Sequence, residues 1–570
     1  MKYSELCQTY EELEKNPSRL KKIEILSDFL KKLKKEDNKE IIYLVKGKVF
    51  PDYSNKEIGI SDKLVIKVLS KSSGLSEKEI INKWRKIGDL GKVSEDVMKT
   101  KKQHTLYSEK LTVNKILENL RKLPELEGKG TIEKKLSLIS ELLISANTLE
   151  AKYLIRTLLR DLRIGVADST IRDAIVLSCS SENEFDSKEK KTEIVNLVQS
   201  SYDTSLDWKQ VYEKACKGIK ELEKTILEPG KPIKVMLFLK ENNIEDGFKR
   251  VGKPALLDYK YDGFRIMINK DENDNIKLFT RRLENVTKQF PEVKDYVKKY
   301  VKGDTFILDS EAVGYNPKTR KYKPFQEISQ RIKRKYEIEK LQKELPIEIN
   351  VFDIVYYNGE SLLDKQFKER RKLIEKIINK EKFKIRPSEA IISDSETEAK
   401  EFYKKAIENG EEGIMMKNLE APYKPGARVG YGVKIKPEEN EFDLIIIGAE
   451  YGTGKRAGWL TSFKIACRNK DNLFDIGKVS TGLKEKESEG LSFKELTKKL
   501  KPLILEEKGR EVIVKPELVV TVVYQNIQKS STYSSGFALR FPRIMRLRPD
   551  RSKSDIATID EIKNDYDRAN

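Results

Sequence analysis

Histidine is almost absent from this chain, and its scarcity narrows the chemistry that the protein can perform. His104 is the only histidine among 570 residues. Triads with a histidine base, and most histidine-based metal sites, are therefore excluded. Cys7, Cys179, Cys216 and Cys467 lie far apart and form no C-x-x-C pair. The sequence thus indicates neither a zinc site nor the disulfide framework of a secreted protein.

Long apolar runs are missing as well. No apolar segment approaches the roughly 18 residues that cross a bilayer, and the start MKYSELCQTY has no apolar signal-peptide core. We therefore expect a cytoplasmic protein in a reducing compartment, with no membrane partner. Catalysis in such a chain should depend on lysine, arginine, aspartate and glutamate.

Charge is what the sequence has in abundance. Charged residues make up 36% of the chain, and 113 lysines and arginines against 93 aspartates and glutamates give a formal net charge of +20. This excess favours a polyanionic partner, with nucleic acid as the first candidate, because neutralised phosphates release counterions. A basic, solvated surface without a partner is the alternative. Since both signs alternate along the chain, we expect the partner to contact folded surfaces.

Length and periodicity predict a multidomain protein. Residues 1–230 carry apolar residues at spacings of three and four, as in YSELCQTYEELEK and EKKLSLISELLISA, which predicts an all-α domain. After the segment KTILEPGKPIKVM, strand-like stretches such as DTFILDSEAVGY alternate with helical ones, which predicts an α+β domain over residues 231–436. Short strands with glycine-rich turns over residues 437–570 predict a small β-barrel of the OB kind, a class that often binds nucleic acid.

A turn within the helical region suits contact with a nucleic-acid backbone. In RIGVADSTI, Gly165 is predicted to end one helix, and Asp168 or Ser169 to cap the next. Helix termini present backbone N–H groups that bind phosphates. The arginines that precede the turn are Arg156, Arg160 and Arg163. We expect Arg163 and Gly165 to contact DNA, with a helical hairpin of solvated basic face as the alternative.

Lys260-Tyr261-Asp262-Gly263 is the most informative string in the chain. It places one lysine after the apolar strand Ala255-Leu256-Leu257 and before a turn glycine, where an amine nucleophile would lie. Alone the string means little, because a lysine-rich chain of this length contains one by chance in roughly a quarter of cases. Its weight comes from further strings that follow it in order.

The first of these strings each have a chemical and a structural interpretation. Arg265 shares a predicted strand face with Gly263, and Thr280-Arg281-Arg282 ends a strand. Either arginine site can contact a phosphate or remain a surface charge. Asp309 and Glu311 lie on one strand face by the two-residue period. Paired carboxylates in an apolar segment need a compensating cation, which favours a metal role.

The later strings extend the pattern. Phe352 in INVFDIV is a core aromatic by default, unless a base stacks on it. Glu411-Glu412 stands before the apolar strand GIMMK, and Lys434 and Lys436 share one strand face that suits a triphosphate. We expect these neighbouring cations to lower the pKa of Lys260 towards that of a free, nucleophilic amine.

Taken in order, KYDG, FTRR, LDSE, VFD, EEGIMMK and VKIK resemble the nucleotidyltransferase motifs of the ATP-dependent DNA ligases, over essentially the whole chain. RIGVADSTI resembles the minor-groove contact segment of the archaeal and eukaryotic replicative type, and LRFPRIMRLRPDR resembles the last motif of their OB domain. The resemblance implies an enzyme that uses ATP and Mg²⁺ on nicked double-stranded DNA. AMP would pass from a lysine to the 5′-phosphate, and the 3′-hydroxyl would displace it to seal the strand.

The resemblance also implies a role for each candidate residue. Lys260 would be the catalytic residue that accepts AMP, Asp258 would contact the adenine amino group, and Phe352 would stack on the base. Glu311 and Glu412 would bind the metal. The other residues expected to contact the nucleotide are Arg265, Arg281, Lys417, Lys434, Lys436 and Arg548, with Glu311 in this set too and Asp550 acting beside Arg548.

Three positions depart from the family pattern. Asp258 stands where glutamate is usual, which shortens the reach to adenine by one methylene. Gly432 stands where tryptophan precedes the VKIK string, which predicts looser packing there. Arg551 replaces the common final lysine with a planar group that still binds pyrophosphate oxygens. None of the three removes a charge that the chemistry requires.

The segment KKQHTLY resembles the short clamp-binding motif of replication proteins. Gln103 would form a hydrogen bond beside an apolar pocket that receives Leu106 and Tyr107. Packing of these two side chains onto the helical domain is the alternative. A sliding clamp is thus a candidate partner of a protein that we otherwise expect to be a monomer.

Two other functions remain open from the residues. An RNA ligase or capping-type nucleotidyltransferase shares the lysine chemistry, but the long helical region with its RIGVADS turn fits encirclement of a duplex better. A non-catalytic DNA-binding scaffold would explain the charge and the domains. It gives no reason for lysines and carboxylates to occur in this order.

Overall fold

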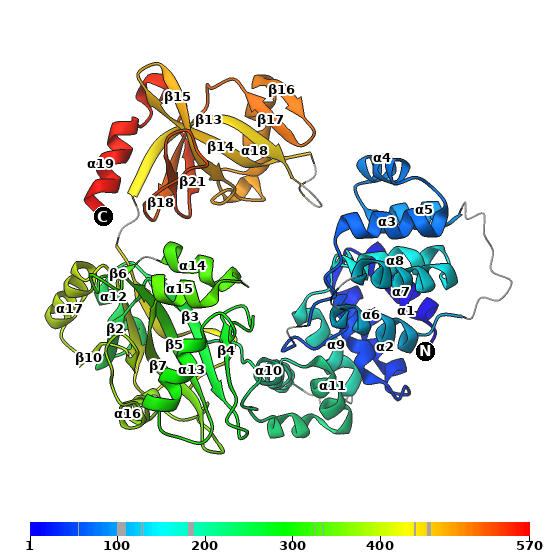
Figure 1. Cartoon of the computed structure of the whole chain (residues 1–570), viewed down its shortest axis with the longest axis horizontal. Coiled ribbons are helices and arrows are strands. Elements are labelled where there is room, and N and C mark those ends of the chain that lie inside the picture. The colour runs from blue at the N-terminus through cyan, green and yellow to red at the C-terminus, as the bar shows by residue number, and fades with distance from the viewer. Residues whose placement is uncertain are drawn as a thin grey trace. The chain divides into compact units, whose positions relative to one another are not determined.

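The chain divides into two compact units, residues 1–436 and 437–570 (Figure 1). The computed structural model describes residues 1–54, 56–99, 110–126, 128, 130–180, 187–323, 325–334, 336–437, 440–452, 456 and 458–569. The first unit holds a helical region followed by two sheets, and the second is rich in strands. The predicted clamp-binding residues Gln103, Leu106 and Tyr107 lie outside the described residues.

The helical region confirms the all-α prediction. Ser76 and Asn147 are N-caps of two helices, each in a capping box with a glutamate three residues later. The apolar helix faces meet in one continuous core, which includes Leu44, Ile139 and Leu154. The α-helices are α1 (Tyr3–Lys15), α2 (Arg19–Leu33), α3 (Asp62–Ser73), α4 (Glu77–Ile87), α5 (Leu90–Lys99), α6 (Val113–Lys122), α7 (Thr131–Ser145), α8 (Thr148–Leu158), α9 (Asp168–Cys179), α10 (Lys188–Ser205) and α11 (Trp208–Lys217). Short 3₁₀ helices cover Lys39–Lys46, Leu123–Glu125 and Ile219–Lys224.

The turn around Gly165 differs from its predicted form. α8 ends at Leu158, well before Gly165, and the N-cap of α9 is Ala167, whose side chain makes no capping hydrogen bond. The prediction that Gly165 ends a helix and that Asp168 or Ser169 caps the next was therefore wrong. Asp168 is instead the first residue of α9, and its carboxylate pairs with the Lys46 ammonium at 2.6 Å.

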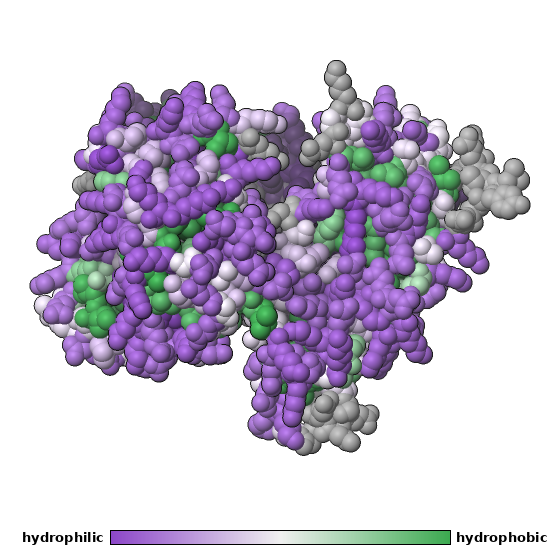
Figure 2. All heavy atoms as spheres, turned by 60° about the horizontal axis from the view of Figure 1, so that its bottom comes forward, coloured by the Kyte–Doolittle hydropathy of each residue, from purple (hydrophilic) through white to green (hydrophobic). Residues whose placement is uncertain are grey.

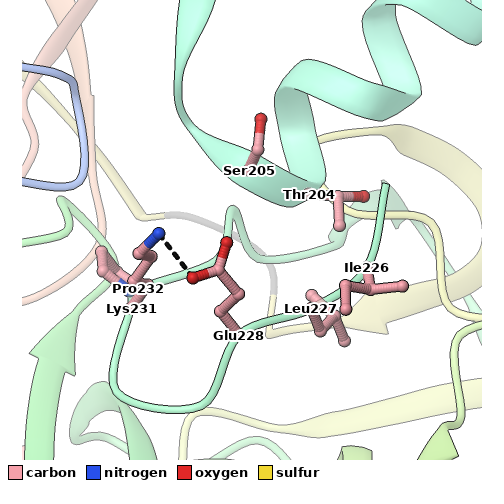
Figure 3. A pocket seen from close by; sticks show the side chains of 7 residues that line it. All are labelled: Thr204, Ser205, Ile226, Leu227, Glu228, Lys231 and Pro232. Atoms are coloured by element: carbon pink, nitrogen blue, oxygen red, sulfur yellow. Dashed lines mark ion pairs between the residues drawn. The ribbon is translucent and has the colours of Figure 1, made fainter. Parts of the chain in front are cut away.

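A proline- and glycine-containing segment joins the helical region to the first strand. Figure 3 shows the residues around a small hollow in this segment, where Glu228 pairs with Lys231 at 2.6 Å. The hollow measures about 10 Å³, which is the room of one water molecule. It therefore carries no ligand site, and the segment serves as a connection.

Two sheets, mainly antiparallel, form the rest of the first unit. The first has the order β1-β12-β11-β2-β10, and the second has the order β4-β3-β5-β7-β8 with β6 beside β5 and β9 beside β7. The strands of the first sheet are β1 (Leu237–Glu241), β2 (Ala255–Tyr259), β10 (Ala390–Ser393), β11 (Ile414–Asn418) and β12 (Arg428–Ile435). Those of the second are β3 (Phe264–Lys270), β4 (Ile276–Thr280), β5 (Phe306–Tyr315), β6 (Tyr322–Lys323), β7 (Ile347–Tyr357), β8 (Glu360–Ser361) and β9 (Ile385–Pro387).

Helices cover these sheets, as the alternating sequence pattern predicted. Phe248 of α12 packs in one core with Leu257 and Met416 of the first sheet. Val293 of α13 packs with Ile349 in the core of the second sheet. The helices are α12 (Ile244–Val251), α13 (Pro291–Tyr300), α14 (Phe325–Lys333), α15 (Ile338–Glu344), α16 (Phe367–Ile377) and α17 (Glu396–Glu408).

The second unit is built on one long strand. β13 pairs with β14 along one edge and with β17 and β18 along the other, and β18 continues to β21. This coiled arrangement, around a core with Leu444, Phe463 and Val520, agrees with the predicted OB-type class. The elements are β13 (Asn440–Tyr451), β14 (Leu460–Asn469), β15 (Asn472–Val479), α18 (Phe493–Leu500), β16 (Ile504–Lys508), β17 (Glu511–Val514), β18 (Val519–Tyr524), β19 (Ile527–Lys529), β20 (Phe537–Leu539), β21 (Arg543–Leu547) and α19 (Ile559–Ala569), with 3₁₀ turns at Glu487–Glu489, Lys501–Leu503 and Lys553–Asp555.

Hydrophilic residues cover most of the face drawn in Figure 2, and apolar residues appear there only in small patches. No helix in the described parts of the chain is both long and apolar enough to cross a membrane.

Candidate active site

Lys260 lies where the two sheets of the first unit meet. β2 ends directly before it, and its backbone N–H donates to the Gly413 carbonyl at 2.9 Å while the Glu412 N–H donates to the Lys260 carbonyl at 2.8 Å. The chain then crosses to β3 at Gly263. A Cβ atom there would lie 2.3 Å from the Ala312 carbonyl oxygen, so only glycine fits. The KYDG string is thus a sheet-to-sheet crossing that holds the lysine backbone in place.

The Lys260 ammonium faces carboxylates. Its Nζ lies 3.1 Å from Glu412 Oε2, and the Lys436 ammonium lies 2.5 Å from the same oxygen. Burial lowers the pKa of Lys260, but Glu412 and Glu311 outweigh burial, and the pKa is raised. The predicted decrease was wrong for the protein without nucleotide, because carboxylates rather than lysines determine the charge around the amine. Burial raises the pKa of Glu412, and Lys260 and Lys436 together lower it to about 2, so this carboxylate is ionised.

Positive charge gathers at the end of β12. Burial lowers the pKa of Lys434, and the charges of Lys436 and Lys260 lower it further, with smaller effects from Arg428 and Arg281. None of the described residues forms an ion pair with Lys434. Arg281 is exposed just beyond the end of β4. This cluster joins three of the predicted phosphate contacts and would be relieved by a polyanion.

Asp258 presents a buried acceptor that has no donor. Its Oδ2 accepts from the Lys417 ammonium at 2.7 Å and from the Ser388 hydroxyl at 3.2 Å. Its Oδ1 is buried and has no hydrogen-bond partner among the described residues. Leaving a buried acceptor without a donor costs about 1–3 kcal/mol. The oxygen is therefore suited to a donor on a ligand, while Lys417, a predicted nucleotide contact, is bound to Asp258.

Phe352 projects from a bulge in β7. The ladder with β5 passes from one register pair to the next across an extra residue, and that residue is Phe352. The flanking pairs are Asp309 with Asp353 and Ser310 with Val351. The Arg265 guanidinium lies 5.2 Å from the centroid of the Phe352 ring and the Lys417 ammonium lies 4.7 Å from it. The ring is half-buried and carries cations on its surface, which differs from the default of a core aromatic.

A buried network holds Arg265 beneath this ring. Its Nε donates to Asp309 Oδ1 at 2.8 Å, its Nη2 donates to Asp309 Oδ2, and its Nη1 donates to the Met236 carbonyl at 2.8 Å. The Tyr423 hydroxyl donates to Asp309 Oδ2 at 2.7 Å and accepts the Met236 N–H at 3.1 Å. Asp309 therefore binds an arginine, and the metal role suggested for it by its strand face was wrong. Sequence reasoning missed Tyr423, because a lone tyrosine in a loop carries no signal of its contacts.

Glu311 is a carboxylate without a compensating partner. It lies opposite Arg265 in the β3–β5 register, yet no hydrogen bond or ion pair joins its carboxylate to another described residue. Burial raises its pKa to about 7, although Lys260 and Arg265 oppose that rise. The described residues contain no group of three or more histidine, cysteine, aspartate or glutamate side chains arranged for a metal. Glu311 and Glu412 nevertheless fit Mg²⁺, which keeps much of its shell in water and phosphate oxygens.

Glu411 differs from its neighbour Glu412. It is buried, and its Oε2 accepts the backbone N–H of Asp262 at 3.2 Å. Burial raises the pKa of Glu411 to about 8, so the carboxyl is largely neutral at pH 7. Glu411 therefore supports the turn that carries Lys260, and Glu412 faces the Lys260 amine.

The packing at Gly432 is closed rather than loose. A Cβ atom on Gly432 would lie 2.8 Å from the ring of Phe238, which comes from the adjacent strand β1. Phe238 thus occupies the space that a larger residue at position 432 would need. The expectation of looser packing was wrong, because a neighbouring strand supplies the aromatic ring.

The predicted DNA-contact residues lie in the loop between α8 and α9. Arg163 is 45% exposed at its side chain and has a φ of +58°, and its Nε pairs with Asp161 at 2.7 Å. Gly165 has a φ of +66°, and a Cβ atom there would lie 2.4 Å from the Lys22 ammonium. The loop therefore presents an exposed arginine beside a turn whose positive φ at position 165 favours glycine.

Arg156, in contrast, cannot contact a ligand. Its side chain is 2% exposed, and its guanidinium pairs with Glu14 at 2.8 Å and with Asp89 at 2.6 Å. It also donates to the Leu162 carbonyl at 3.1 Å. Its suggested place among the DNA contacts was wrong, because α8 turns this residue into the core of the helical region.

In the second unit, the predicted pair from the last motif forms one cluster after β21. Arg548 pairs with Asp550 at 2.7 Å and with Asp443 of β13 at 2.7 Å. Arg551 Nε lies 3.7 Å from Asp443. The guanidinium of Arg548 is thus oriented by two carboxylates within its own unit.

Comparison with known proteins covers the same regions. Residues 2–176 match the model "DNA ligase N terminus", residues 235–436 match "ATP dependent DNA ligase domain", and residues 456–551 match "ATP dependent DNA ligase C terminal region". A DNA ligase of Nanoarchaeum equitans is 44% identical over 572 residues, with 100% of this chain and 98% of that protein covered. A DNA ligase of Methanopyrus kandleri is 38% identical over 570 residues, with 100% and 99% covered.

Among solved structures, a chain titled Pmar-Lig_PreS3 shares the fold. It has a TM-score of 0.56 at 17% identity, and the match covers 95% of this chain and 99% of that one. The sequence matches, which span all three regions, go further than this likeness of fold. This chain belongs to the family of ATP-dependent DNA ligases.

Proposed function

We propose that this protein seals nicks in double-stranded DNA with ATP, and that Lys260 carries AMP between the two substrates. One observation carries the proposal. Asp258, whose Oδ1 is buried without a donor, is the last residue but one of β2, and Lys260 is the first residue after that strand ends. We infer that this short spacing brings a base acceptor and a nucleophile to the same end of the strand. The family membership and the net charge of +20 agree with this function.

The base site favours adenine. Asp258 Oδ1 would accept a hydrogen bond from the 6-amino group, and the hydrogen bond from the Lys417 ammonium to Oδ2 orients the carboxylate. A base with a carbonyl at that position would face a buried carboxylate oxygen and be rejected. Phe352 would stack on the base. Arg265 lies against the Phe352 ring and would contact the ribose side of the nucleotide.

In the first reaction step, the Lys260 amine gives up a proton and attacks the α-phosphorus of ATP. A P–N bond forms, the bond from the α-phosphorus to the bridging oxygen breaks, and pyrophosphate leaves. Lys434, Lys436 and Arg281 would hold the phosphate charge, with Arg548 and Asp550 contributing from the second unit. Mg²⁺, held by Glu311 and Glu412, would neutralise charge on the phosphates.

In the later steps, AMP passes to the 5′-phosphate of the nick, and the 3′-hydroxyl then displaces AMP to form the phosphodiester. Both are in-line displacements at phosphorus, so positioning and charge provide most of the catalysis. Arg163 and the Gly165 turn would hold the DNA backbone. A protein with a single histidine can perform these steps because few acid–base groups are needed.

The wider setting follows from the substrate. Nicked DNA arises in replication and repair, and we propose that a monomer acts there, with a sliding clamp bound through Gln103, Leu106 and Tyr107. A peptide of residues 101–107 with Leu106 and Tyr107 replaced by alanine should fail to compete for the clamp if this contact exists.

The test of the function has two parts. The purified chain is mixed with α-labelled ATP and Mg²⁺, denatured, and digested, and the labelled peptide is identified. Label on the peptide containing Lys260, together with sealing of a nicked duplex, is expected. Label that persists in Lys260→Ala would overturn the assignment of the nucleophile, and failure to seal any nicked duplex would overturn the proposed function.

A further inference from the structure

Two cysteines that play no part in the proposed reaction lie side by side in the helical region. The Sγ atoms of Cys179 and Cys216 are 3.3 Å apart and share a hydrogen bond. Both residues are free thiols and only partly buried. Cys7 and Cys467, in contrast, are fully buried in the cores of the two units. The chain thus has one accessible, paired set of thiols and two isolated ones.

The positions of the pair in the helices permit a bond. Cys179 is the last residue of α9, and Cys216 is the last but one of α11. A disulfide requires its sulfurs at about 2.05 Å, so the two sulfurs must approach by little more than 1 Å from their present distance. Helix ends adjust more readily than helix interiors, since their last carbonyls have no intrahelical partners to lose. Gly218, just past α11, adds freedom at that end.

The other ends of the same two helices are already joined. Trp208, the first residue of α11, donates its indole N–H to Asp168, the first residue of α9, at 3.3 Å. The two helices therefore begin together and end together, and they run in the same direction. A disulfide between Cys179 and Cys216 would join the C-terminal ends of α9 and α11, whose N-terminal ends are already joined by the hydrogen bond from Trp208 to Asp168.

We propose that Cys179 and Cys216 form a reversible intramolecular disulfide that fastens α9 to α11 and stabilises the helical region. The oxidant is a small disulfide of the type RSSR. The Cys216 thiolate attacks one sulfur of RSSR, an S–S bond forms between them, and RS⁻ leaves. Cys179 then loses its proton, and its sulfur attacks the Cys216 sulfur and expels the second RS⁻. Two thiols are oxidised and one RSSR is reduced to two RSH.

The surroundings of the pair support this order of attack. The hydrogen bond from Cys179 lowers the pKa of Cys216 to about 6, against the effect of burial, and the charges of Lys34 and Lys39 act in the same direction. The same hydrogen bond raises the pKa of Cys179. These directions favour Cys216 as the attacking sulfur and Cys179 as the resolving thiol.

The effect on the fold follows from chain entropy. A bond between residues 179 and 216 closes the intervening chain into a loop and restricts the unfolded state more than the native one. We expect the helical region of the oxidised protein to unfold about 5–10 °C above that of the reduced protein. The loop that carries Arg163 precedes α9 directly, so the link also braces the element behind the proposed DNA contact.

The experiment uses the full chain incubated with oxidised glutathione and then denatured and alkylated. Of the four thiols in the sequence, two should be lost, peptide mapping should show a Cys179–Cys216 link, and dithiothreitol should reverse both the link and the thermal shift. Cys7→Ser is the matched control and should form the same link. Cys179→Ser and Cys216→Ser should show no thermal shift on oxidation. Four thiols that persist in the oxidised wild type, or a link between molecules instead, would overturn the proposal.

Discussion

Charged side chains lie both around the end of β2 and inside the helical region, but they differ in how many of their charges have partners. Arg156 forms ion pairs with Glu14 and Asp89, so its charge is matched by carboxylates, although its Nε has no hydrogen-bond partner among the described residues. Around the end of β2, Asp258 Oδ1 lacks a donor, and neither Lys434 of β12 nor Glu311 of β5 has an ion-pair partner among the described residues. Satisfied charges hold a fold together, whereas unsatisfied ones mark where a ligand must complete the network.

Replacing the nucleophile should separate chemistry from binding most completely. Lys260→Ala should lose covalent AMP altogether, because Lys260 is the proposed acceptor of AMP, whereas Lys436, which pairs with the same Glu412 oxygen, is proposed to bind phosphate charge. Affinity for nicked duplex should remain, since it arises from phosphate contacts spread over the surface. Acid-stable labelling and a gel-shift titration measure the two effects. Lys260→Arg is the matched control, because it keeps the charge near Glu412 and should still not be labelled.

Breaking the matched charges should cost stability instead. Arg156→Ala leaves Glu14 and Asp89 without their shared partner, and removing one member of a buried pair costs about 3–5 kcal/mol. Urea unfolding followed by circular dichroism measures the loss. Labelling of Lys260 should persist at temperatures where the variant is still folded. A variant as stable as the wild type would show that the ion pairs of Arg156 do not stabilise the helical region.

Replacing Asp258, the proposed acceptor of the base, should have an intermediate effect and act mainly on ATP binding. Asp258→Asn removes the charge paired with Lys417 and places an amide where the donor-free oxygen stands. We expect the KM for ATP in the labelling reaction to rise about 10- to 100-fold, which corresponds to the 1–3 kcal/mol of a lost buried hydrogen bond. The rate at saturating ATP should fall less. Asp258→Glu is the matched control. It keeps the negative charge and should bind ATP at least as well as the wild type.

The pH dependence of Mg²⁺ binding should test the proposed role of Glu311. Its folded pKa of about 7 lies above the ordinary value, so the protonated form dominates below pH 7. Mg²⁺ requires the ionised form, and its apparent affinity should rise about tenfold per pH unit up to pH 7 and then level off. The sign for stability is opposite, since this group favours the folded state less as pH rises from its unfolded pKa to about 7. Titrations of Mg²⁺ at pH 5.5 to 8.5 test the affinity, and urea unfolding over the same pH range tests the stability. Glu311→Gln should abolish the pH dependence of both; an unchanged profile would assign the metal elsewhere.

The smallest effect is expected at the DNA loop. Arg163→Ala removes an exposed charge that pairs with the surface Asp161 and, at 3.6 Å, with the buried Asp89. Asp89 keeps its closer ion pair with Arg156, so stability should change by at most about 1 kcal/mol. DNA binding should weaken similarly for all sequences, and the slope of log affinity against log salt should decrease by about one. Arg160→Ala, the neighbouring exposed arginine, is the control. A sequence-selective defect or an unchanged slope would exclude a phosphate contact at Arg163.

Local patterns predicted much of this arrangement. Helical spacing located α1, α2, α7 and α8, and apolar segments located β2, β5 and β7, because periodicity follows directly from which face is buried. The order of the motifs also predicted a shared site for Lys260, Glu311 and Glu412, and in the structure both glutamates raise the pKa of Lys260. The predictions that failed were those on contacts, such as Asp309 with Arg265 in place of a metal, or the cap of α9, because each depends on a partner distant in sequence.

By itself, the sequence determined the fold class, and it predicted the nucleophile and a polyanionic partner from residue types, motif order and net charge. Only the tertiary structure decided which charges are satisfied. It brought Tyr423 under Arg265, placed Phe238 in the space at Gly432, and set carboxylates around Lys260 so that its pKa is raised. The physical reason is that pairing and desolvation depend on the distances between segments far apart in the chain, and these distances are set only when the sheets and helices pack.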